Sequence, residues 1–151
     1  MSAEDNLKKL GLTLPDVAPP IANYVRFRQA GELVFLSGQG PRKPDGTNCT
    51  GKVGLDVTVE QAYEHAKLTG LGLLSAMKAA AGSLDRVEVV KLLGMVNATP
   101  DFGQHPAVIN GCSDLLVAVL GDRGRHARSA VGMGSLPNGI TVEIEAIIRI
   151  V

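Results

Sequence analysis

The sequence contains no tryptophan, only two tyrosines and three phenylalanines, and no excess of charge, because 15 basic residues face 15 acidic ones. Proteins that bind RNA or DNA through phosphates usually carry a basic surplus and aromatic side chains on which bases stack. The composition therefore argues against a nucleic acid as the partner of this protein.

Long apolar runs and metal-binding patterns are also missing. No stretch approaches the roughly 18 apolar residues of a membrane-spanning helix, and the N-terminal MSAEDNLKKLG lacks the apolar region of a signal peptide. The two cysteines, Cys49 and Cys112, do not have the spacing of a metal site, and the three histidines are scattered. We expect a cytoplasmic protein with no membrane association, no metal and no disulfide.

What is present is the composition of an ordinary globular protein, with 45% hydrophobic and 20% charged residues in a chain of 151. This length fits a single domain, 1–151, that can bury its own core. Within it, residues 1–20 predict a short polar helix closed by Gly11 and an extended connector, LPDVAPP.

The remaining elements predict an α/β (α+β) fold with one mixed sheet. Strand composition at 23–29 and 32–38, around an Ala30-Gly31 turn, predicts a hairpin. A helix over 59–82, which Thr58 and Gln61 open as a capping box, a strand over 86–98 and a helix over 105–121 follow. Two final strands are predicted as a hairpin around the LPNG turn. Both helices should cover one face of the sheet and leave the other face open.

The final strand alternates between two rows of residues. The even row from Ile140 to Ile150 is apolar throughout, and the odd row from Thr141 to Val151 includes two glutamates and an arginine. We expect the even row to face the core and the odd row, which is half apolar, to meet another subunit. Whether Arg128 on the preceding strand shares a face with Glu143 depends on a register that the sequence leaves open.

Simple structural interpretations exist for the residues that stand out. Arg128 and Glu143, taken alone, fit an interface salt bridge. Tyr24 and Phe35 fit core positions. The helix segment NGCSD contains Ser113, but the sequence places no base beside it, so a buried structural Cys112 is the simpler interpretation.

Two segments, YVRFRQAGELVFLSGQGP (24–41) and ARSAVGMGSLPNGITVEIEAI (127–147), resemble the Rid family of reactive enamine/imine deaminases. These proteins are also called YjgF-like or L-PSP endoribonuclease-like, and the resemblance covers about residues 20 to 151. It implies a chorismate-mutase-like fold, a homotrimeric barrel with clefts between subunits, and no metal or organic cofactor.

The resemblance also implies roles for individual residues. Arg128 would grip the carboxylate of a small metabolite, and Glu143 would hold the attacking water. The other residues implied to lie in the cleft are Tyr24, Ser37, Gly38, Asn110 and Ala130. Ala130 stands where deaminases of the family commonly carry a cysteine, which is thought to act largely through its backbone.

These residue types suit the hydrolysis of small 2-imino or enamine acids to 2-keto acids and ammonia. An arginine binds a carboxylate through two parallel hydrogen bonds, and a partly desolvated glutamate with a raised pKa can transfer a proton. Two alternatives remain open: a non-catalytic trimer that binds keto acids in the same cleft, and the endoribonuclease activity that the older family name suggests.

Overall fold

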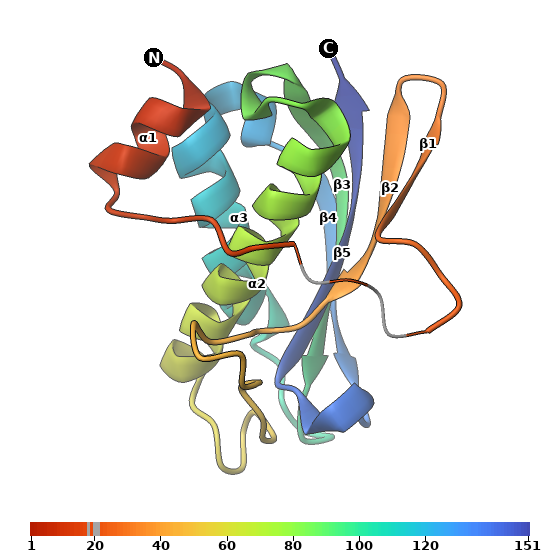
Figure 1. The fold of residues 1–151 in the computed structure, drawn as a ribbon. Helices are drawn as coiled ribbons and strands as arrows, with labels where there is room; N and C mark the ends of the chain where they lie inside the picture. Colours follow the sequence, from red (N-terminus) through yellow and green to blue (C-terminus); the bar gives the residue numbers. More distant parts are fainter. Residues whose placement is uncertain (18, 20–21) are drawn as a thin grey trace.

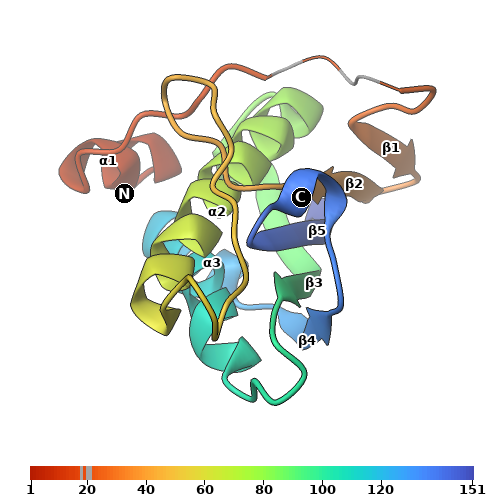
Figure 2. The same ribbon diagram turned by 90° about the horizontal axis from the view of Figure 1, so that it is seen from below.

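The structure is a computed structural model that describes residues 1–17, 19 and 22–151. The chain forms two layers, with the helices on one face of a five-stranded sheet (Figure 1; Figure 2, the view from below). The predicted α+β fold with one mixed sheet is confirmed. Residues 18 and 20 of the predicted connector lie outside the described residues.

The order of elements along the chain is also as predicted. The helices are α1 (Ala3–Lys9), α2 (Val59–Ala81) and α3 (His105–Leu120). The strands are β1 (Phe27–Ala30), β2 (Leu33–Gln39), β3 (Val87–Asn97), β4 (Ala127–Met133) and β5 (Val142–Ile150). They lie in the order β1-β2-β5-β3-β4, and β4 is parallel to β3 while the other pairs are antiparallel.

Local sequence signals explain where α2 begins and how it packs. Thr58 and Gln61 form the predicted capping box, and Gly82 ends the helix in the left-handed conformation, with φ 80°. The backbone of α2 approaches α3 closely at Gly111, where a Cβ atom would lie 2.0 Å from the carbonyl oxygen of Tyr63. Glycine at this position lets the two long helices share one apolar layer over the sheet.

Strand β5 confirms the predicted core row, because Val142, Ile144 and Ile148 are fully buried. Thr141 differs from the prediction that it joins the odd row. It is fully buried, and its Oγ1 atom lies 2.9 Å from Nδ1 of His65. The alternation begins only at Val142, where β5 starts, so the residue before it is free to turn inward.

The predicted hairpin around LPNG is wrong. Strand β3 lies between β4 and β5, so these two strands do not pair with each other. The turn itself exists as a short 3-10 turn over Pro137–Gly139, in which Asn138 has φ 58°. Turn residues indicate only that the chain reverses locally. Which strand pairs with which depends on contacts throughout the sheet.

One face of the sheet is open in the single chain, as predicted. On this face, which we call the outer face, Phe35 is 44% and Val131 is 38% exposed. Tyr24, in the segment before β1, is 50% exposed. The interpretation of Phe35 and Tyr24 as core residues is therefore wrong for the isolated chain.

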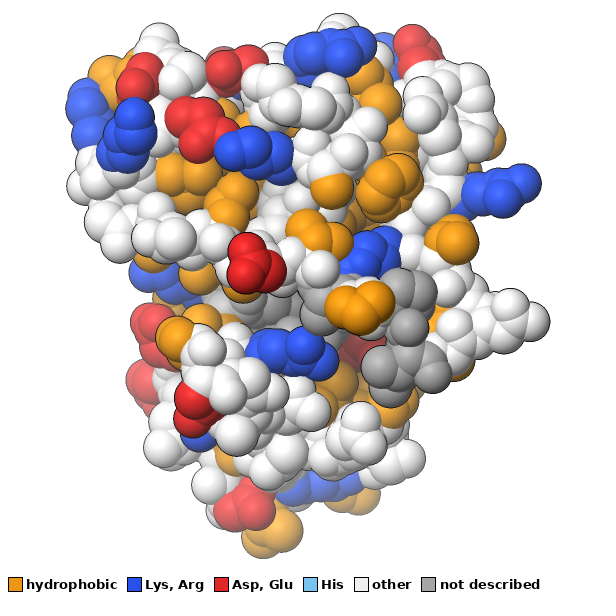
Figure 3. Space-filling model, viewed as in Figure 1, with side chains coloured by type: hydrophobic (Ala, Val, Ile, Leu, Met, Phe, Trp, Pro, Cys, Tyr) orange, Lys and Arg blue, Asp and Glu red, His pale blue; other side chains and the backbone are white. Residues whose placement is uncertain are grey.

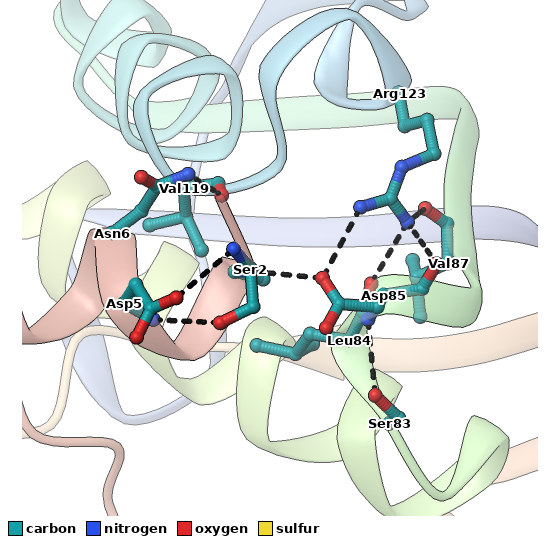
Figure 4. A network of polar contacts seen from close by, with 10 residues as sticks. Ser2, Asp5, Asn6, Ser83, Leu84, Asp85, Val87, Val119 and Arg123 are labelled. Carbon is teal, nitrogen blue, oxygen red and sulfur yellow. Dashed lines mark hydrogen bonds and ion pairs between the residues drawn. The ribbon is translucent and has the colours of Figure 1, made fainter.

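Helix α1 packs more firmly than its polar composition predicts (Figure 4). Ala3 and Leu7 are buried in the common core. The backbone N–H of Ala3 donates to Oδ1 of Asp85 over 2.9 Å, and the same oxygen lies 3.5 Å from Nη2 of Arg123. Asn6 donates through its side chain to the carbonyl oxygen of Val119 on α3. The helix is thus amphipathic and is tied to the turn that follows α2 and to the C-terminal end of α3.

Candidate functional site

The Ser-Gly pair that the sequence analysis singled out forms a β-bulge. Leu36 of β2 pairs with Ala146 of β5, and Gln39 pairs with Ile144. Two residues of β2, Ser37 and Gly38, therefore face the single residue Glu145 of β5. Bulges break the alternation of a strand, re-aim neighbouring side chains and are frequent beside active sites.

The bulge brings the backbone of Gly38 against the carboxyl group of Glu143. A Cβ atom on Gly38 would lie 3.2 Å from Cδ and 3.3 Å from Oε2 of Glu143, so only glycine leaves this carboxylate free space. The contact partly buries Glu143. Burial, together with the nearby charge of Glu145, raises the pKa of Glu143 above its ordinary value.

Ser37 attaches the segment that contains Tyr24 to the sheet. Its hydroxyl donates to the carbonyl oxygen of Val25 over 2.6 Å, and its backbone N–H donates to that of Arg26 over 2.8 Å. The chain around Tyr24 is therefore held beside the bulge. These contacts give Ser37 a positioning role in the single chain, in addition to any contact with a ligand.

Arg128 lies on β4 and points toward the helical layer. It pairs in register with Leu92, which is fully buried under the helices. Its Nη1 atom donates to Oγ of Ser113 over 3.0 Å, and its Nη2 atom donates to the carbonyl oxygen of Pro106 over 3.3 Å. Both partners belong to α3, so this helix fixes the direction of the guanidinium group.

Asn110 and Ala130 belong to the same neighbourhood as Arg128. Asn110 lies on α3 between Pro106 and Ser113, at helical spacings that place the three residues on one stripe. Ala130 follows Arg128 by two positions on β4 and faces the same layer.

The backbone N–H of Ala130 points to the open edge of the sheet. The carbonyl oxygen of Met133 accepts from Ala98 on the β3 side. The N–H and C=O groups of successive residues point to opposite sides of a strand. Ala130 is three positions from Met133, so its N–H and C=O groups point away from β3. Among the described residues, no strand pairs with β4 at that edge.

Ser113 has a partner that was not predicted from the sequence. The Nε2 atom of His126 lies 2.9 Å from Oγ of Ser113, and its Nδ1 atom lies 2.6 Å from the carbonyl oxygen of Gly124. The spacing of two between His126 and Arg128 could have indicated that they share a direction. The contact with Ser113 depends on how α3 crosses β4, which the sequence does not reveal.

The predicted residues thus form two groups, and Arg128 and Glu143 lie on opposite faces of the sheet. Arg128 pairs with Leu92 on β3, and Glu143 pairs with Met95, which is three positions away. Three positions along a strand reverse the face. The outer-face group contains Glu143, Gly38 and Ser37, with the Tyr24 segment beside it, and the helix-face group contains Arg128, Ala130 and Asn110.

Other surface features do not unite the two groups. A shallow depression of about 330 Å³ on the outer face is lined mainly by Phe35, Lys91, Leu93, Ser129, Glu145 and Ile147. Basic and acidic side chains are interspersed on the face that Figure 3 shows. The described residues contain no cluster of three or more His, Cys, Asp or Glu side chains that could hold a metal.

In the part of the chain that the structure covers, no helix is both long and apolar enough to cross a membrane.

Comparison with known proteins identifies relatives over nearly the whole chain. Residues 4–141 match the family described as YjgF/chorismate mutase-like, putative endoribonuclease. Protein TCP17 of Trypanosoma cruzi is 43% identical over 147 residues, which cover 96% of this chain and 92% of that protein.

Solved structures give the same result. Atu1372 of Agrobacterium tumefaciens, described as a protein of unknown function, is 46% identical with a TM-score of 0.90, covering 99% of this chain and 94% of that one. A putative endoribonuclease of Shewanella oneidensis is 30% identical with a TM-score of 0.95, covering 99% and 100%. RidA of Psychrobacter is 28% identical with a TM-score of 0.62, covering 90% and 96%.

Proposed function

The chain belongs to the YjgF/chorismate mutase-like family, and on this premise we propose that it hydrolyses small 2-imino or enamine acids to 2-keto acids and ammonia. The observation that carries the proposal is the pair of groups around Arg128 and Glu143. One offers a held guanidinium group and the other a partly buried carboxyl group whose pKa is raised. These are the two functions that the reaction needs.

The reaction divides between the two residues. Arg128 binds the substrate carboxylate through paired N–H donors. Glu143 removes a proton from water while the water oxygen forms a bond to the imine carbon, and the C=N electron pair moves to nitrogen. The protonated Glu143 then returns the proton to nitrogen, which gives a carbinolamine. In its collapse, Glu143 takes the proton of the new hydroxyl group and passes it to the amino nitrogen, the C=O bond forms as the C–N bond breaks, and ammonia leaves the keto acid. A carboxyl group with a raised pKa suits both steps, because it is a stronger base than an ordinary carboxylate and can still give the proton back.

We place the reaction between two copies of the chain, within a homotrimer. In one chain, Arg128 and Glu143 lie on opposite faces of the sheet. Their strands are separated by β3, so the backbones of β4 and β5 are roughly 10 Å apart across the sheet. One substrate reaches both groups if the helix-face group of one copy meets the outer-face group of the next. The exposed apolar side chains of the outer face, Phe35 and Val131, support such an association. Light scattering at micromolar concentration should give a trimer, and a monomer mass would rule out the shared site.

Ala130 is compatible with this proposal although the family cysteine is missing. Its backbone N–H points to the open edge beside Arg128, and a main-chain donor does not depend on the side chain. Main-chain N–H groups commonly stabilise carboxylates and developing negative charge.

The decisive experiment measures keto-acid release from 2-imino acids that are generated in the assay from amino acids. The protein should accelerate release above the spontaneous rate, and Arg128→Ala should abolish the acceleration while the trimer persists. If the wild-type protein binds pyruvate but gives no acceleration, the non-catalytic binding protein replaces the enzyme. If RNA is cleaved or bound tightly at physiological salt, the endoribonuclease alternative is correct, although the balanced charge argues against it.

A further inference from the structure

We propose that Ser113 and His126 are positioning residues that hold the guanidinium group of Arg128 ready for a carboxylate. The inference rests on the proposed role of Arg128 in binding the substrate. It concerns two residues to which neither the family resemblance nor the sequence analysis gives a role.

The directions of the hydrogen bonds follow from chemistry alone. The carbonyl oxygen of Gly124 can only accept, so the Nδ1 atom of His126, 2.6 Å away, must carry the proton. In the neutral ring Nε2 is then an acceptor, and Ser113 donates its hydroxyl proton to it over 2.9 Å. The remaining lone pairs of Ser113 Oγ accept from Nη1 of Arg128 over 3.0 Å. We call this series of hydrogen bonds, from Gly124 through His126 and Ser113 to Arg128, the relay.

The relay leaves Arg128 with donors to spare. An arginine has five N–H donors in a planar fork. Among the described residues, one bonds to Ser113 and one to the carbonyl oxygen of Pro106, so three remain for a ligand. Because a free arginine side chain loses much rotational freedom when it binds, a fork that is already held binds a carboxylate at a smaller entropic cost.

The charge state of His126 is part of the arrangement. Burial lowers the pKa of His126, the carbonyl of Gly124 partly opposes this shift, and the positive charge of Arg128 adds to it. The neutral ring, which accepts from Ser113, is therefore the form present at neutral pH.

A nucleophilic role for Ser113 fits the geometry less well. Its oxygen already accepts from Arg128, and it lies in the middle of α3, where backbone N–H groups bond within the helix. The helix therefore offers no pair of free N–H groups to stabilise an oxyanion beside this serine. Positioning is the role that uses all of the observed contacts.

The first arm of the test needs no substrate. Nitrogen-15 NMR of the ligand-free protein should show the Nδ1–H tautomer of His126 and slowly rotating guanidinium protons on Arg128. Ser113→Ala should broaden or remove the guanidinium signals. The Nε2–H tautomer, or a freely rotating guanidinium group in the wild-type protein, would overturn the proposal. This arm decides on the relay even if imine hydrolysis is not found.

The second arm measures pyruvate affinity by calorimetry. Ser113→Ala and His126→Phe should each weaken binding about tenfold, the effect of losing one hydrogen bond to a charged group. His126→Gln, which supplies an amide oxygen that can accept from the Ser113 hydroxyl, should recover part of the loss. In the Ser113→Ala background, His126→Phe should have little further effect, because the histidine acts through the serine.

The matched control is Ser75→Ala. Ser75 is also a helix serine, and its hydroxyl donates to the carbonyl oxygen of Pro15 over 2.7 Å, on α2 and away from Arg128. It should lower the melting temperature without changing pyruvate affinity. If Ser113→Ala behaves like Ser75→Ala, or if the effects of Ser113 and His126 simply add, the relay has only a structural role and the proposal is wrong.

Discussion

Arg128 and Glu143 leave opposite faces of one sheet, and β3 separates the strands that carry them. A substrate that needs both must therefore draw them from different copies of the chain. The arrangement predicts that two inactive variants repair each other.

When Arg128→Ala and Glu143→Gln are unfolded together in equal amounts and refolded, mixed trimers should regain activity. A site is intact only if each copy contributes its unaltered residue, which random assembly gives at about a quarter of the sites. Each variant refolded alone is the control. A mixture that stays inactive, although mass spectrometry shows mixed trimers, would mean that one chain supplies both residues.

Glu143→Gln separates chemistry from binding. The amide keeps the shape of the side chain but cannot take a proton, so turnover should fall about 10²–10⁴-fold while pyruvate affinity is retained. Steady-state kinetics and calorimetry on the same preparation test this. Equal loss of affinity and turnover would instead assign Glu143 to substrate binding.

The same variant should change how stability depends on pH. Because the folded pKa of Glu143 is raised, its contribution to folding stability is full below its ordinary value of 4.5 and is lost as pH rises through the folded pKa. Glu143→Gln should therefore melt higher than the wild-type protein at pH 8 and at nearly the same temperature at pH 4. A lower melting temperature at pH 8 would show that the charged carboxylate is stabilised in the assembly.

Gly38→Ala should lower turnover more than it lowers stability. The new methyl group would lie 3.2 Å from the carboxyl carbon of Glu143, which must move aside. We expect a fall in turnover of about tenfold or more, since small displacements of a catalytic group are costly. Gly103→Ala, whose methyl group meets open space, is the control. Unchanged turnover in Gly38→Ala would show that Glu143 does not need its observed position.

Arg123→Ala should destabilise the attachment of α1. Its Nη1 atom donates to the carbonyl oxygens of Leu84, Asp85 and Val87 (Figure 4). Its Nη2 atom lies 3.5 Å from Oδ1 of Asp85, the oxygen that accepts from the backbone N–H of Ala3. Loss of these contacts should cost about 1–3 kcal/mol in urea unfolding. Arg125→Ala, which removes an exposed ion pair with Asp122, should change stability by less than about 0.5 kcal/mol. Equal effects would mean that Arg123 does not hold the helix.

The features that the sequence predicted correctly depend on nearby residues. Capping by Thr58 and the alternation of β5 after Val142 are local, and both were confirmed. The pairing of β4 with β5 was mispredicted because LPNG resembles a hairpin turn. In the structure β3, which ends thirty residues before β4 begins, lies between β4 and β5.

The candidate site shows the same division. The residues implied by the family resemblance could be named individually, but the separation of Arg128 from Glu143 depends on the register that each shares with β3. The contact between Ser113 and His126 joins a helix to the start of a strand, and no periodicity in the sequence reports it.

The bulge in β2 also sets the direction of the side chains that follow it. Before it, odd-numbered residues such as Phe35 face outward. After it, Gln39 points toward α2, where its side-chain oxygen would lie 2.5 Å from a Cβ atom on Gly72. A regular strand of the same length would turn Gln39 to the outer face, because Leu36 faces inward and lies three positions before it. The extra residue therefore keeps the loop after β2 on the side of the helices, and removal of Ser37 or Gly38 would leave Gln39 opposite Ile144 while it abolished the bulge that faces Glu145.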